Sequence, residues 1–440
     1  MNQRWTLHVE NFARIESADI EISPLMCFIG DNNSGKSYIM SLLWGLLHHS
    51  WYFLFSDNGV AVKRQEDCRR WREQFNGQKC FIDDNAAQKY VALFNDLLDI
   101  NKEKIITDIF NREISVGKIE IRNFKTLNVA SFYCSSSELT IKNSEQVFKV
   151  SGNYQKWVNA DFAICWSLIM GGLTTPYPIE EATGLPIYLP ASRTGFLLTR
   201  REIATRSISR NFSLQSEDKK IRETLTSPYI QFLQMINSLT DSPKNHSEEK
   251  MSLINFLQKE IIHGDIKVKA DGKIINYSPE DVKSDELPMS LTSSVVTETA
   301  ALLLMLTNRL YFRLVVIEEP EAHLHPALQK KIAQLLIRFV HSGIPIWITT
   351  HSDTILQHFN NMIKLNNRQV EEREKLLKEF NYTSDDLLTA EEIRLYQFER
   401  GNERTKIQKL ESGKYGFVAN LFNKAIDELV AEIYAFQEDE

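Results

Sequence analysis

One octapeptide constrains the fold of this chain more than any other feature. Residues 30–37 read Gly-Asp-Asn-Asn-Ser-Gly-Lys-Ser, which matches the phosphate-loop pattern G-x-x-x-x-G-K-[ST]. An apolar run of strand type, residues 25–29, precedes the loop, and an amphipathic helical pattern, residues 38–47, follows it. A turn between a strand and a helix directs backbone N–H groups at a phosphate chain. The octapeptide therefore predicts a nucleotide site at a strand-to-helix turn.

The loop motif also predicts which side chains meet the ligand. Lys36 is expected to reach the β- and γ-phosphates, and the Ser37 hydroxyl is expected to hold Mg²⁺. The implied ligands are ATP and Mg²⁺. The loop residues expected to contact the nucleotide are Gly30, Asn32, Asn33, Ser34, Gly35, Lys36 and Ser37.

Two further apolar strand patterns end in residues of types that often act in catalysis, glutamate and histidine. Residues 314–317 are followed by Glu318 and Glu319, and a strand of this kind is expected beside the phosphate-loop strand. Glu318 is expected to hold Mg²⁺, directly or through water. Glu319 is expected to polarise the attacking water, because phosphoryl transfer needs an oriented nucleophile. The second pattern, residues 346–350, ends in His351, which is expected to hydrogen-bond the γ-phosphate.

Three more runs connect these motifs to a family. Residues 318–326 read Glu-Glu-Pro-Glu-Ala-His-Leu-His-Pro, residues 7–15 read Leu-His-Val-Glu-Asn-Phe-Ala-Arg-Ile, and residues 186–193 read Pro-Ile-Tyr-Leu-Pro-Ala-Ser-Arg. Together with the motifs above, they resemble the ABC-type ATPases related to OLD, RecF and SMC proteins, over most of the chain. The resemblance implies an α/β fold, an ABC-type P-loop ATPase lobe with a mixed sheet and flanking helices. It also places Arg193 near the nucleotide site.

The periodicity indicates that a long insertion divides this lobe. Residues 1–50 and 288–440 are expected to form the ATPase lobe with a C-terminal strand and helix. Residues 51–287 are expected to form an inserted, mainly helical lobe with short strands, from which residues 186–200 return to the ATPase lobe. Asp271-Gly272 between two strand patterns predicts a hairpin. Helices are also expected at 62–75, 86–110, 155–173, 215–262 and 414–436, and strands at 117–150 and 391–398.

ATPases of this class need a signature serine at a helix N-terminus that reaches the γ-phosphate bound by another subunit. The candidate is the run 290–298, Ser-Leu-Thr-Ser-Ser-Val-Val-Thr-Glu, in which Ser293 and Ser294 are equivalent candidates. Small hydroxyl residues that open a helix suit an anion, although Val295 stands where the family usually has glycine. The alternative interpretation is a plain N-cap, with Glu298 closing a capping box.

The composition of the chain is that of a globular protein and argues against several other classes. Of 440 residues, 43% are hydrophobic and 25% charged, which is ordinary globular usage. No window is long and apolar enough for a membrane span, and no secretory pattern opens the chain. Five scattered cysteines without a C-x-x-C pair argue against a zinc site or disulfide scaffold, so a cytoplasmic protein is expected. The net charge of −7 gives no global electrostatic case for nucleic-acid binding.

One segment departs from this acidic balance. Residues 193–210 carry five arginines and a single acid, Glu202. One interpretation is a surface for nucleic acid or an acidic protein. The other is a solvated helix face, or arginines that pair with neighbouring acids. The arginines are Arg193, Arg200, Arg201, Arg206 and Arg210.

The sequence after His351 bears on the biological role. Relatives with a fused TOPRIM nuclease carry an Asp-x-Asp strand end for two metals, and no Asp-x-Asp occurs here. The chain is therefore expected to lack nuclease activity. It most resembles the AriA ATPases of PARIS anti-phage systems. That resemblance implies a homo-oligomer, up to a hexamer, which holds a separate TOPRIM-type nuclease and releases it on sensing a phage-encoded trigger protein, often an acidic DNA mimic.

Two other functions compete with this one. A RecF-like DNA-repair ATPase would clamp DNA directly and would need a basic face. A transporter's nucleotide-binding subunit is disfavoured, because transporters usually carry Asp at the position of Glu318.

Overall fold

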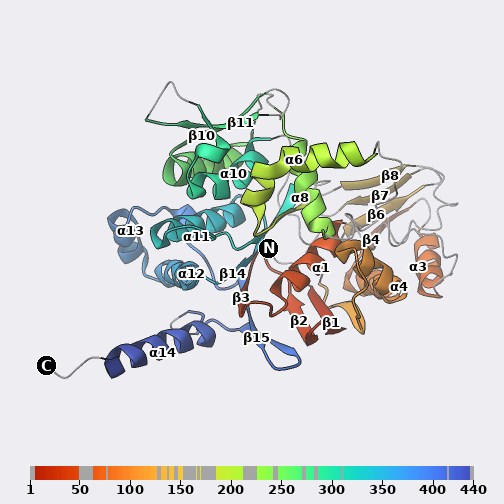
Figure 1. Cartoon of the computed structure of the whole chain (residues 1–440). Coiled ribbons are helices and arrows are strands. Elements are labelled where there is room, and N and C mark those ends of the chain that lie inside the picture. The colour runs from red at the N-terminus through yellow and green to blue at the C-terminus, as the bar shows by residue number, and fades with distance from the viewer. Residues whose placement is uncertain are drawn as a thin grey trace.

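A nine-stranded mixed sheet organises the computed structural model (Figure 1). Its strand order is β5-β1-β2-β16-β15-β3-β14-β13-β9. Five adjacent strands run parallel: β15 (Ile393–Arg400), β3 (Leu25–Gly30), β14 (Ile346–Thr350), β13 (Phe312–Glu318) and β9 (Leu185–Leu189). The structure describes residues 5–48, 63–75, 78–125, 130–135, 138–142, 147–151, 165, 169, 185–211, 225–240, 246–269, 274–281, 286–308, 310, 312–413 and 416–436.

The order of the parallel strands corrects one expectation. β14 lies between β3 and β13, so the strand that ends in Glu318 is not beside the phosphate-loop strand. Central parallel strands are buried on both faces and all read as apolar runs, so the sequence does not reveal which one lies between the others. Thr350 pairs with Ile29 and Thr349 pairs with Glu318. The carboxyl ends of the three strands therefore meet at one edge of the sheet.

The other half of the sheet is mostly antiparallel. β1 pairs with β2 and with β5, and β15 pairs with β16, while β16 meets β2 in parallel. These strands are β1 (Thr6–Phe12), β2 (Ile15–Glu21), β5 (Lys118–Arg122) and β16 (Thr405–Leu410). Both β5 and β9 come from the segment between residues 51 and 287, so that segment supplies strands to the large sheet at two places.

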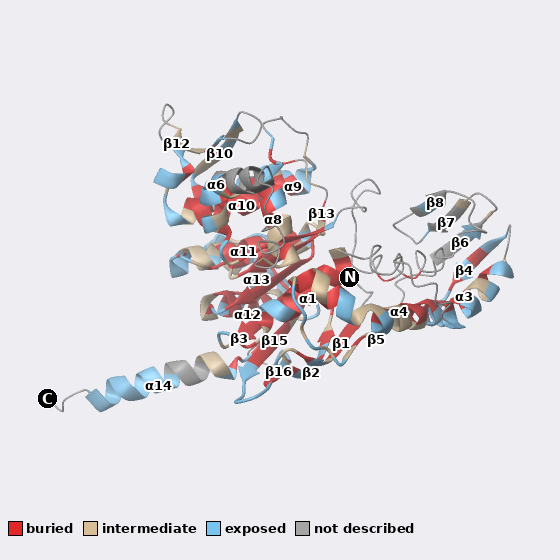
Figure 2. Ribbon diagram, turned by 45° about the vertical axis from the view of Figure 1, so that its right-hand side comes forward, coloured by how far each residue is buried: buried red, intermediate tan, exposed pale blue. Residues whose placement is uncertain are grey.

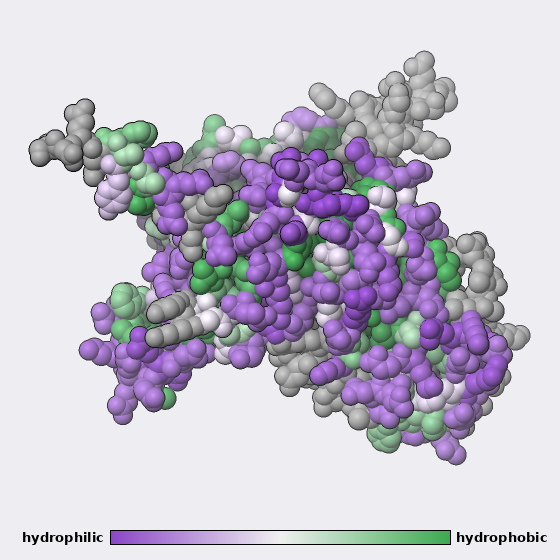
Figure 3. Space-filling view, turned by 90° about the horizontal axis from the view of Figure 1, so that it is seen from below, coloured by the Kyte–Doolittle hydropathy of each residue, from purple (hydrophilic) through white to green (hydrophobic). Residues whose placement is uncertain are grey.

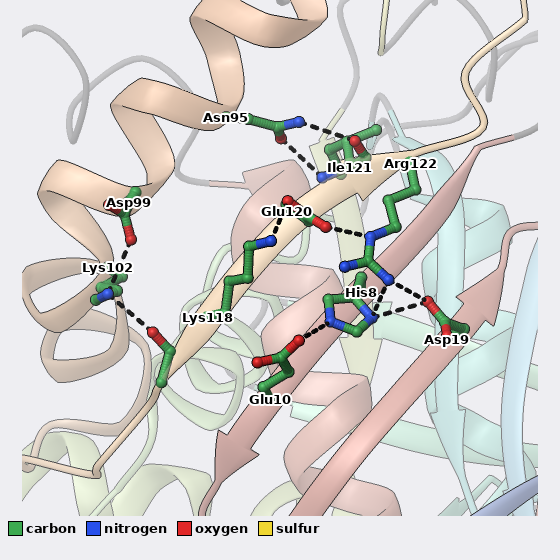
Figure 4. Close-up of polar contacts among 11 residues, drawn as sticks. His8, Glu10, Asp19, Asn95, Asp99, Lys102, Lys118, Glu120, Ile121 and Arg122 are labelled. Carbon is green, nitrogen blue, oxygen red and sulfur yellow. Dashed lines mark hydrogen bonds and ion pairs between the residues drawn. The ribbon is translucent and has the colours of Figure 1, made fainter.

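Polar contacts attach β5 to its neighbours (Figure 4). Asn95 of α4 (Asp84–Phe110) donates to the carbonyl of Ile121 (2.8 Å) and accepts from its N–H (2.7 Å). On the other side, Arg122 Nη1 lies 2.9 Å from His8 Nδ1, and the same ring nitrogen lies 2.8 Å from Asp19 Oδ1. The contacts join α4, β5, β1 and β2 into one unit.

Two apolar cores cover the two faces of the sheet, which is buried throughout its centre (Figure 2). Alternate residues of β3 enter opposite cores, because strand side chains alternate in direction: Met26 and Phe28 join one core, and Cys27 and Ile29 join the other. The first core includes residues of α1 (Lys36–His48) and α4. The second includes residues of α8 (Ser227–Asn237), α9 (Glu248–Leu257), α10 (Ser294–Thr307), α11 (Pro326–His341) and α12 (Asp353–Asn366).

Smaller elements surround this framework. The hairpin prediction is confirmed, since β10 and β11 pair antiparallel with Lys269 opposite Ile274, while Asp271 and Gly272 lie outside the described residues. In the described part of residues 215–262, the expected helical structure consists of α8, α9 and a π-helical turn, and the helical stretch expected at 155–173 falls almost wholly outside the described residues. The elements are α3 (Lys63–Glu73), β4 (Lys79–Ile82), β6 (Ala130–Cys134), β7 (Glu138–Lys142), β8 (Val147–Ser151), α6 (Arg193–Asn211), the π turn Gln258–Ile262, β10 (Gly264–Lys269), β11 (Ile274–Pro279), β12 (Leu287–Pro288) and α13 (Val370–Glu379).

The last helix, α14 (Asn420–Phe436), projects away from the rest of the chain (Figures 1 and 2). It begins six residues later than the pattern predicted, because Gly413 and Gly416 form a β-bridge and Gly416 has φ +85°. Hydrophobic side chains show on its outer end (Figure 3), and those that are exposed include Leu429, Val430, Ile433, Tyr434 and Phe436. Among the helices of the described residues, none combines the length and apolar composition of a membrane span.

Candidate nucleotide site

The phosphate loop joins the end of β3 to the start of α1, as predicted. Gly30 has φ +143°, and a Cβ there would lie 2.2 Å from the carbonyl oxygen of Phe398, so only glycine fits. Gly35 also has a positive φ, +98°. Lys36 Nζ donates to the carbonyls of Gly30 (3.0 Å) and Asp31 (2.7 Å), and its side chain therefore crosses the loop.

The other loop residues differ in exposure. Asn32, Asn33 and Ser37 are exposed, and Asn33 has φ +59°. Ser34 is buried, and its Oγ has no hydrogen-bond partner among the described residues. An unpartnered buried hydroxyl costs about 1–3 kcal/mol, and a phosphate oxygen in the loop would satisfy it. Burial lowers the pKa of Lys36, against the opposing effect of carboxylates headed by Glu319.

Glu318 ends β13 in a buried position and accepts three hydrogen bonds. Its carboxylate accepts from the hydroxyls of Tyr188 (2.8 Å) and Tyr229 (3.0 Å) and from the N–H of Ala191 (3.2 Å). Burial raises the pKa of both tyrosines, and the charge of Glu318 acts in the same direction. The two hydroxyls therefore stay protonated and remain donors.

Glu318 and Ser37, the predicted Mg²⁺ ligands, line one cavity of about 320 Å³, and Tyr229 and Arg112 lie on its wall. The described residues contain no group of three or more His, Cys, Asp or Glu placed to hold a metal. A site of one hydroxyl and one carboxylate still fits Mg²⁺, which is commonly held by one or two protein oxygens, substrate phosphates and water.

Glu319 has a backbone that non-glycine residues rarely adopt, with φ +45°. Its N–H donates to the carbonyl of Thr349 (2.9 Å), which ties this strained residue to the neighbouring strand β14. Its side chain is 41% exposed, and Oε1 lies 3.7 Å from Nε2 of His351. Strain of this kind persists only where the surrounding structure enforces it and is common at active sites.

His351 follows β14 and is fixed by a third glutamate. Glu321 Oε1 accepts from the N–H of His351 and from the hydroxyl of Thr350, both at 2.7 Å. Burial lowers the pKa of His351, and the charge of Lys36 acts in the same direction. The imidazole is therefore neutral near pH 7 and can donate to a phosphate oxygen.

Arg193 connects the end of β13 to α10, the helix whose N-terminus carries the signature candidate. It is 2% exposed, and burial lowers its pKa against the opposing charges of four glutamates headed by Glu298. Its guanidinium donates to four carbonyl oxygens, those of Pro190 (3.3 Å), Glu298 (3.0 Å), Glu318 (2.8 Å) and Glu319 (3.1 Å). One side chain therefore holds β9, α10 and the residues after β13 in a fixed relation.

The signature candidate shows an N-cap but no capping box. Ser293 caps α10 by accepting from the N–H of Val296, and both Ser293 and Ser294 are exposed. Glu298 does not reach back to the cap, since it lies in the second turn. Its carboxylate instead pairs with Arg193 (3.2 Å) and with Nδ1 of His323 (2.9 Å).

The side chains of two of the five arginines of the arginine-rich segment are described, and neither lies on an exposed face. Arg193 and Arg200 are buried, and Arg200 donates to the carbonyl of Ile236 (3.1 Å). The side chains of Arg201, Arg206 and Arg210 lie outside the described residues. Counting charges did not reveal the burial of Arg193 and Arg200, because an arginine fork can be buried when its N–H groups find carbonyl partners.

Sequence reasoning missed several residues of this site. Tyr188, Glu321 and His323 lie inside runs that carry the family resemblance, but nothing in those runs indicated their contacts. Glu298 was interpreted only as a capping residue. Tyr229 comes from α8, and no local pattern connects it to Glu318, a predicted metal ligand 89 residues away.

Comparison with known proteins assigns the family. Solved structures similar to this chain include the SMC head domain from Thermotoga maritima (TM-score 0.33, 11% identity, 93% of this chain and 100% of that chain). They also include the Smc head domain with an extended coiled coil bound to the C-terminal domain of ScpA, derived from Pyrococcus furiosus (0.36, 12%, 98% and 98%), and the ADP conformation of an ATP-binding cassette of an ABC transporter (0.33, 10%, 98% and 99%). No curated protein matches the chain. The profile of the AAA ATPase domain family matches residues 6–356, and because it spans most of the sequence, the chain belongs to that family.

Proposed function

We propose that this chain is an ABC-type ATPase that hydrolyses ATP with Mg²⁺ at the edge where β3, β13 and β14 end. The observation that supports this most strongly is the convergence of Lys36, Glu319 and His351. Glu319 and His351 lie 3.7 Å apart, and the charge of Lys36 is close enough to lower the pKa of His351. Lys36 binds the β- and γ-phosphates, and Glu319 orients the attacking water. Neutral His351 donates to the γ-phosphate. Ser37 and Glu318 would hold Mg²⁺, which supplies charge neutralisation on the phosphates.

We further propose that ATP is shared between two copies of the chain. Ser293 and Ser294 are exposed at the N-terminus of a fourteen-residue helix, where hydroxyls and free N–H groups can meet a phosphate on another subunit. Arg193 ties this helix to the end of β13, so each subunit presents a rigid half-site.

Mixing two inactive variants tests the shared site. Lys36→Ala removes one half of the site, and Ser293→Phe with Ser294→Phe removes the other. Each variant alone should be inactive, and the serine variant should still bind ATP. In a mixture, heterodimers place an intact loop against an intact signature, so about a quarter of the parent activity should return if pairing is random. A mixture as inactive as its components would contradict the shared site.

The proposed biological role is that of a cytoplasmic scaffold and sensor in bacterial anti-phage defence. We propose that the oligomer, up to a hexamer, holds a separate TOPRIM-type nuclease and releases it when a phage-encoded trigger protein is present. The support is the resemblance to the AriA ATPases of PARIS systems in chain length, in the long insertion, in the missing Asp-x-Asp motif and in the run of residues 187–193. Arg193 belongs to this run and now has a structural role, whereas a trigger surface on residues 193–210 loses Arg193 and Arg200.

Co-expression with the product of the neighbouring gene tests this role. The two proteins should co-purify, and phage protection should require both, together with Lys36 and Glu319. The isolated chain should cut no DNA or RNA with Mg²⁺ or Mn²⁺. Protection by this chain alone would contradict the separate effector. Tight binding of the isolated chain to DNA at physiological salt would favour the RecF-like repair function instead.

A further inference from the structure

A second cavity lies away from the nucleotide site, where α11, α12 and α13 pack side by side (Figure 1). Its volume is about 540 Å³, within the range of about 300–1,000 Å³ that small-molecule sites occupy. Most of its wall comes from α12, from Asp353 to Leu365, and the rest comes from α11, α13 and the residues that follow α13. None of the sequence motifs accounts for this cavity.

A buried histidine with a free nitrogen lines the cavity. His358 is 3% exposed, and its Nε2 has no hydrogen-bond partner among the described residues. Leaving a buried polar atom unpaired costs about 1–3 kcal/mol, and such atoms in native proteins usually have a reason. Burial, together with the nearby charge of Lys330, lowers the pKa of His358 to about 4. The ring is therefore neutral near pH 7 and has one N–H to donate.

Cations and aromatic rings supply the rest of the wall. Lys330 and Lys364 line the cavity, and neither has an ion pair within the described part of the chain. Lys330 Nζ lies 5.1 Å from the ring centroid of Tyr382, and that ring lies 5.8 Å from the ring of His358. Phe380 is 56% exposed at the rim, so the cavity opens to solvent there. The wall therefore places a hydrogen-bond donor, two unpaired cations and two aromatic faces around one space.

We propose that this cavity binds a small anion that carries an aromatic ring, of the class of aryl phosphates and nucleoside monophosphates. The ring packs against Tyr382 and Phe380, and the anionic group meets Lys330, Lys364 and Nε2 of His358. Arg368, whose Nη1 lies 3.5 Å from Glu372, also lines the cavity, and Asp353 is the one carboxylate that the described residues place in the lining, so the cations outnumber it. By accepting a hydrogen bond from Nε2 of His358, the ligand removes the free-energy cost of leaving that nitrogen unpaired. Its negative charge neutralises the positive charges of Lys330 and Lys364.

The same helix connects this cavity to the nucleotide site. α12 begins at Asp353, which lines the cavity, two residues after His351. A ligand that shifts the first turn of α12 therefore acts on the segment that carries His351, the residue proposed to donate a hydrogen bond to the γ-phosphate. Occupancy of the cavity is expected to alter the rate of ATP hydrolysis, whereas binding itself does not require the nucleotide site.

Calorimetric titration of the full chain carrying Lys36→Ala tests the site, because this variant lacks the main phosphate contact of the loop. The probes are phenyl phosphate, adenosine monophosphate, inorganic phosphate and benzyl alcohol. At least one of the two ring-bearing phosphates should bind with one site per chain, and both inorganic phosphate and benzyl alcohol should bind more weakly. The tighter of the two ring-bearing probes distinguishes a simple aryl anion from a nucleotide.

Three lysine variants in the same background complete the test. Lys330→Met and Lys364→Met should each weaken binding on the order of tenfold, as the loss of a charged hydrogen-bond partner predicts. Lys331→Met is the matched control. Lys331 follows Lys330 in α11, but its Nζ pairs with Glu260 (2.7 Å) and it does not line the cavity. The Lys331→Met variant should therefore bind the ring-bearing phosphates as tightly as the Lys36→Ala chain does. The proposal is overturned if neither ring-bearing phosphate binds, if inorganic phosphate binds as tightly, or if Lys330→Met and Lys364→Met bind like Lys331→Met. A negative result in this titration would not bear on the ATP site, which the mixing of the two inactive variants tests separately.

Discussion

Replacing Arg193 with methionine should destabilise the ATPase domain strongly. The change removes hydrogen bonds to four carbonyls, and it leaves the side chain of Glu298, itself 2% exposed, without its arginine partner and in contact with the ring of His323. Removing one partner of a buried ion pair costs about 3–5 kcal/mol, because the other charge stays buried. That is a large part of the roughly 5–15 kcal/mol by which a native domain is stable.

A double-mutant cycle separates the ion pair from the general loss of contacts. Arg193→Met, Glu298→Met and the double variant are unfolded in urea and followed by tryptophan fluorescence. The double variant should be more stable than the sum of the single losses predicts, by about 2 kcal/mol, since it buries no lone charge. Arg200→Met is the control for Arg193→Met, because Arg200 is a buried arginine of the same helix that donates to Ile236 instead. Its effect should add to that of Glu298→Met. Additive losses for Arg193 and Glu298, within about 0.5 kcal/mol, would refute the coupling.

Three further predictions concern single side chains. Glu319→Gln should retain ATP binding and slow hydrolysis on the order of a hundredfold, about 3 kcal/mol of barrier, and an unchanged turnover would remove Glu319 from the catalytic role. Tyr229→Phe removes a donor that occupies Glu318, so the Mg²⁺ concentration giving half-maximal ATPase activity should fall; a rise would mean that the hydroxyl helps to hold the metal. Burial alone would raise the pKa of Asp386, but hydrogen bonds headed by that from Arg338 (2.6 Å) lower this pKa in the folded state. The ionised carboxylate of Asp386 therefore stabilises the fold above the ordinary aspartate pKa, near 3.9, and this stabilisation is lost as the pH falls through the lowered folded-state pKa. Asp386→Asn should therefore cost about 3 kcal/mol in urea unfolding at pH 7 and less at pH 3, and an equal loss at both values would contradict this assignment.

Features set by short stretches of sequence were predictable, and features set by distant neighbours were not. The loop from Gly30 to Ser37 follows from a local pattern, because strand, turn and helix are consecutive. The placement of β14 between β3 and β13 could not be predicted, since buried parallel strands have similar compositions. Arg200 was misjudged for a related reason: its charge is visible in the sequence, but its carbonyl partner on another helix is not.

The position of β15 has a consequence for the synthesis of this protein. Gly30 packs against Phe398, and Ser23 donates to the carbonyl of Glu392, 369 residues further along the chain. A ribosome adds roughly 5–20 residues per second, so the loop strand waits for tens of seconds before its neighbour emerges. For most of that time β3 lacks both of its neighbours in the sheet, because β14 also follows it by more than 300 residues. Contacts of such long range fold slowly and expose aggregation-prone surface. Nascent chains stalled before residue 390 should therefore be protease-sensitive around residues 25–47 and should associate with chaperones, whereas chains stalled with residues 393–410 outside the exit tunnel should be protected there.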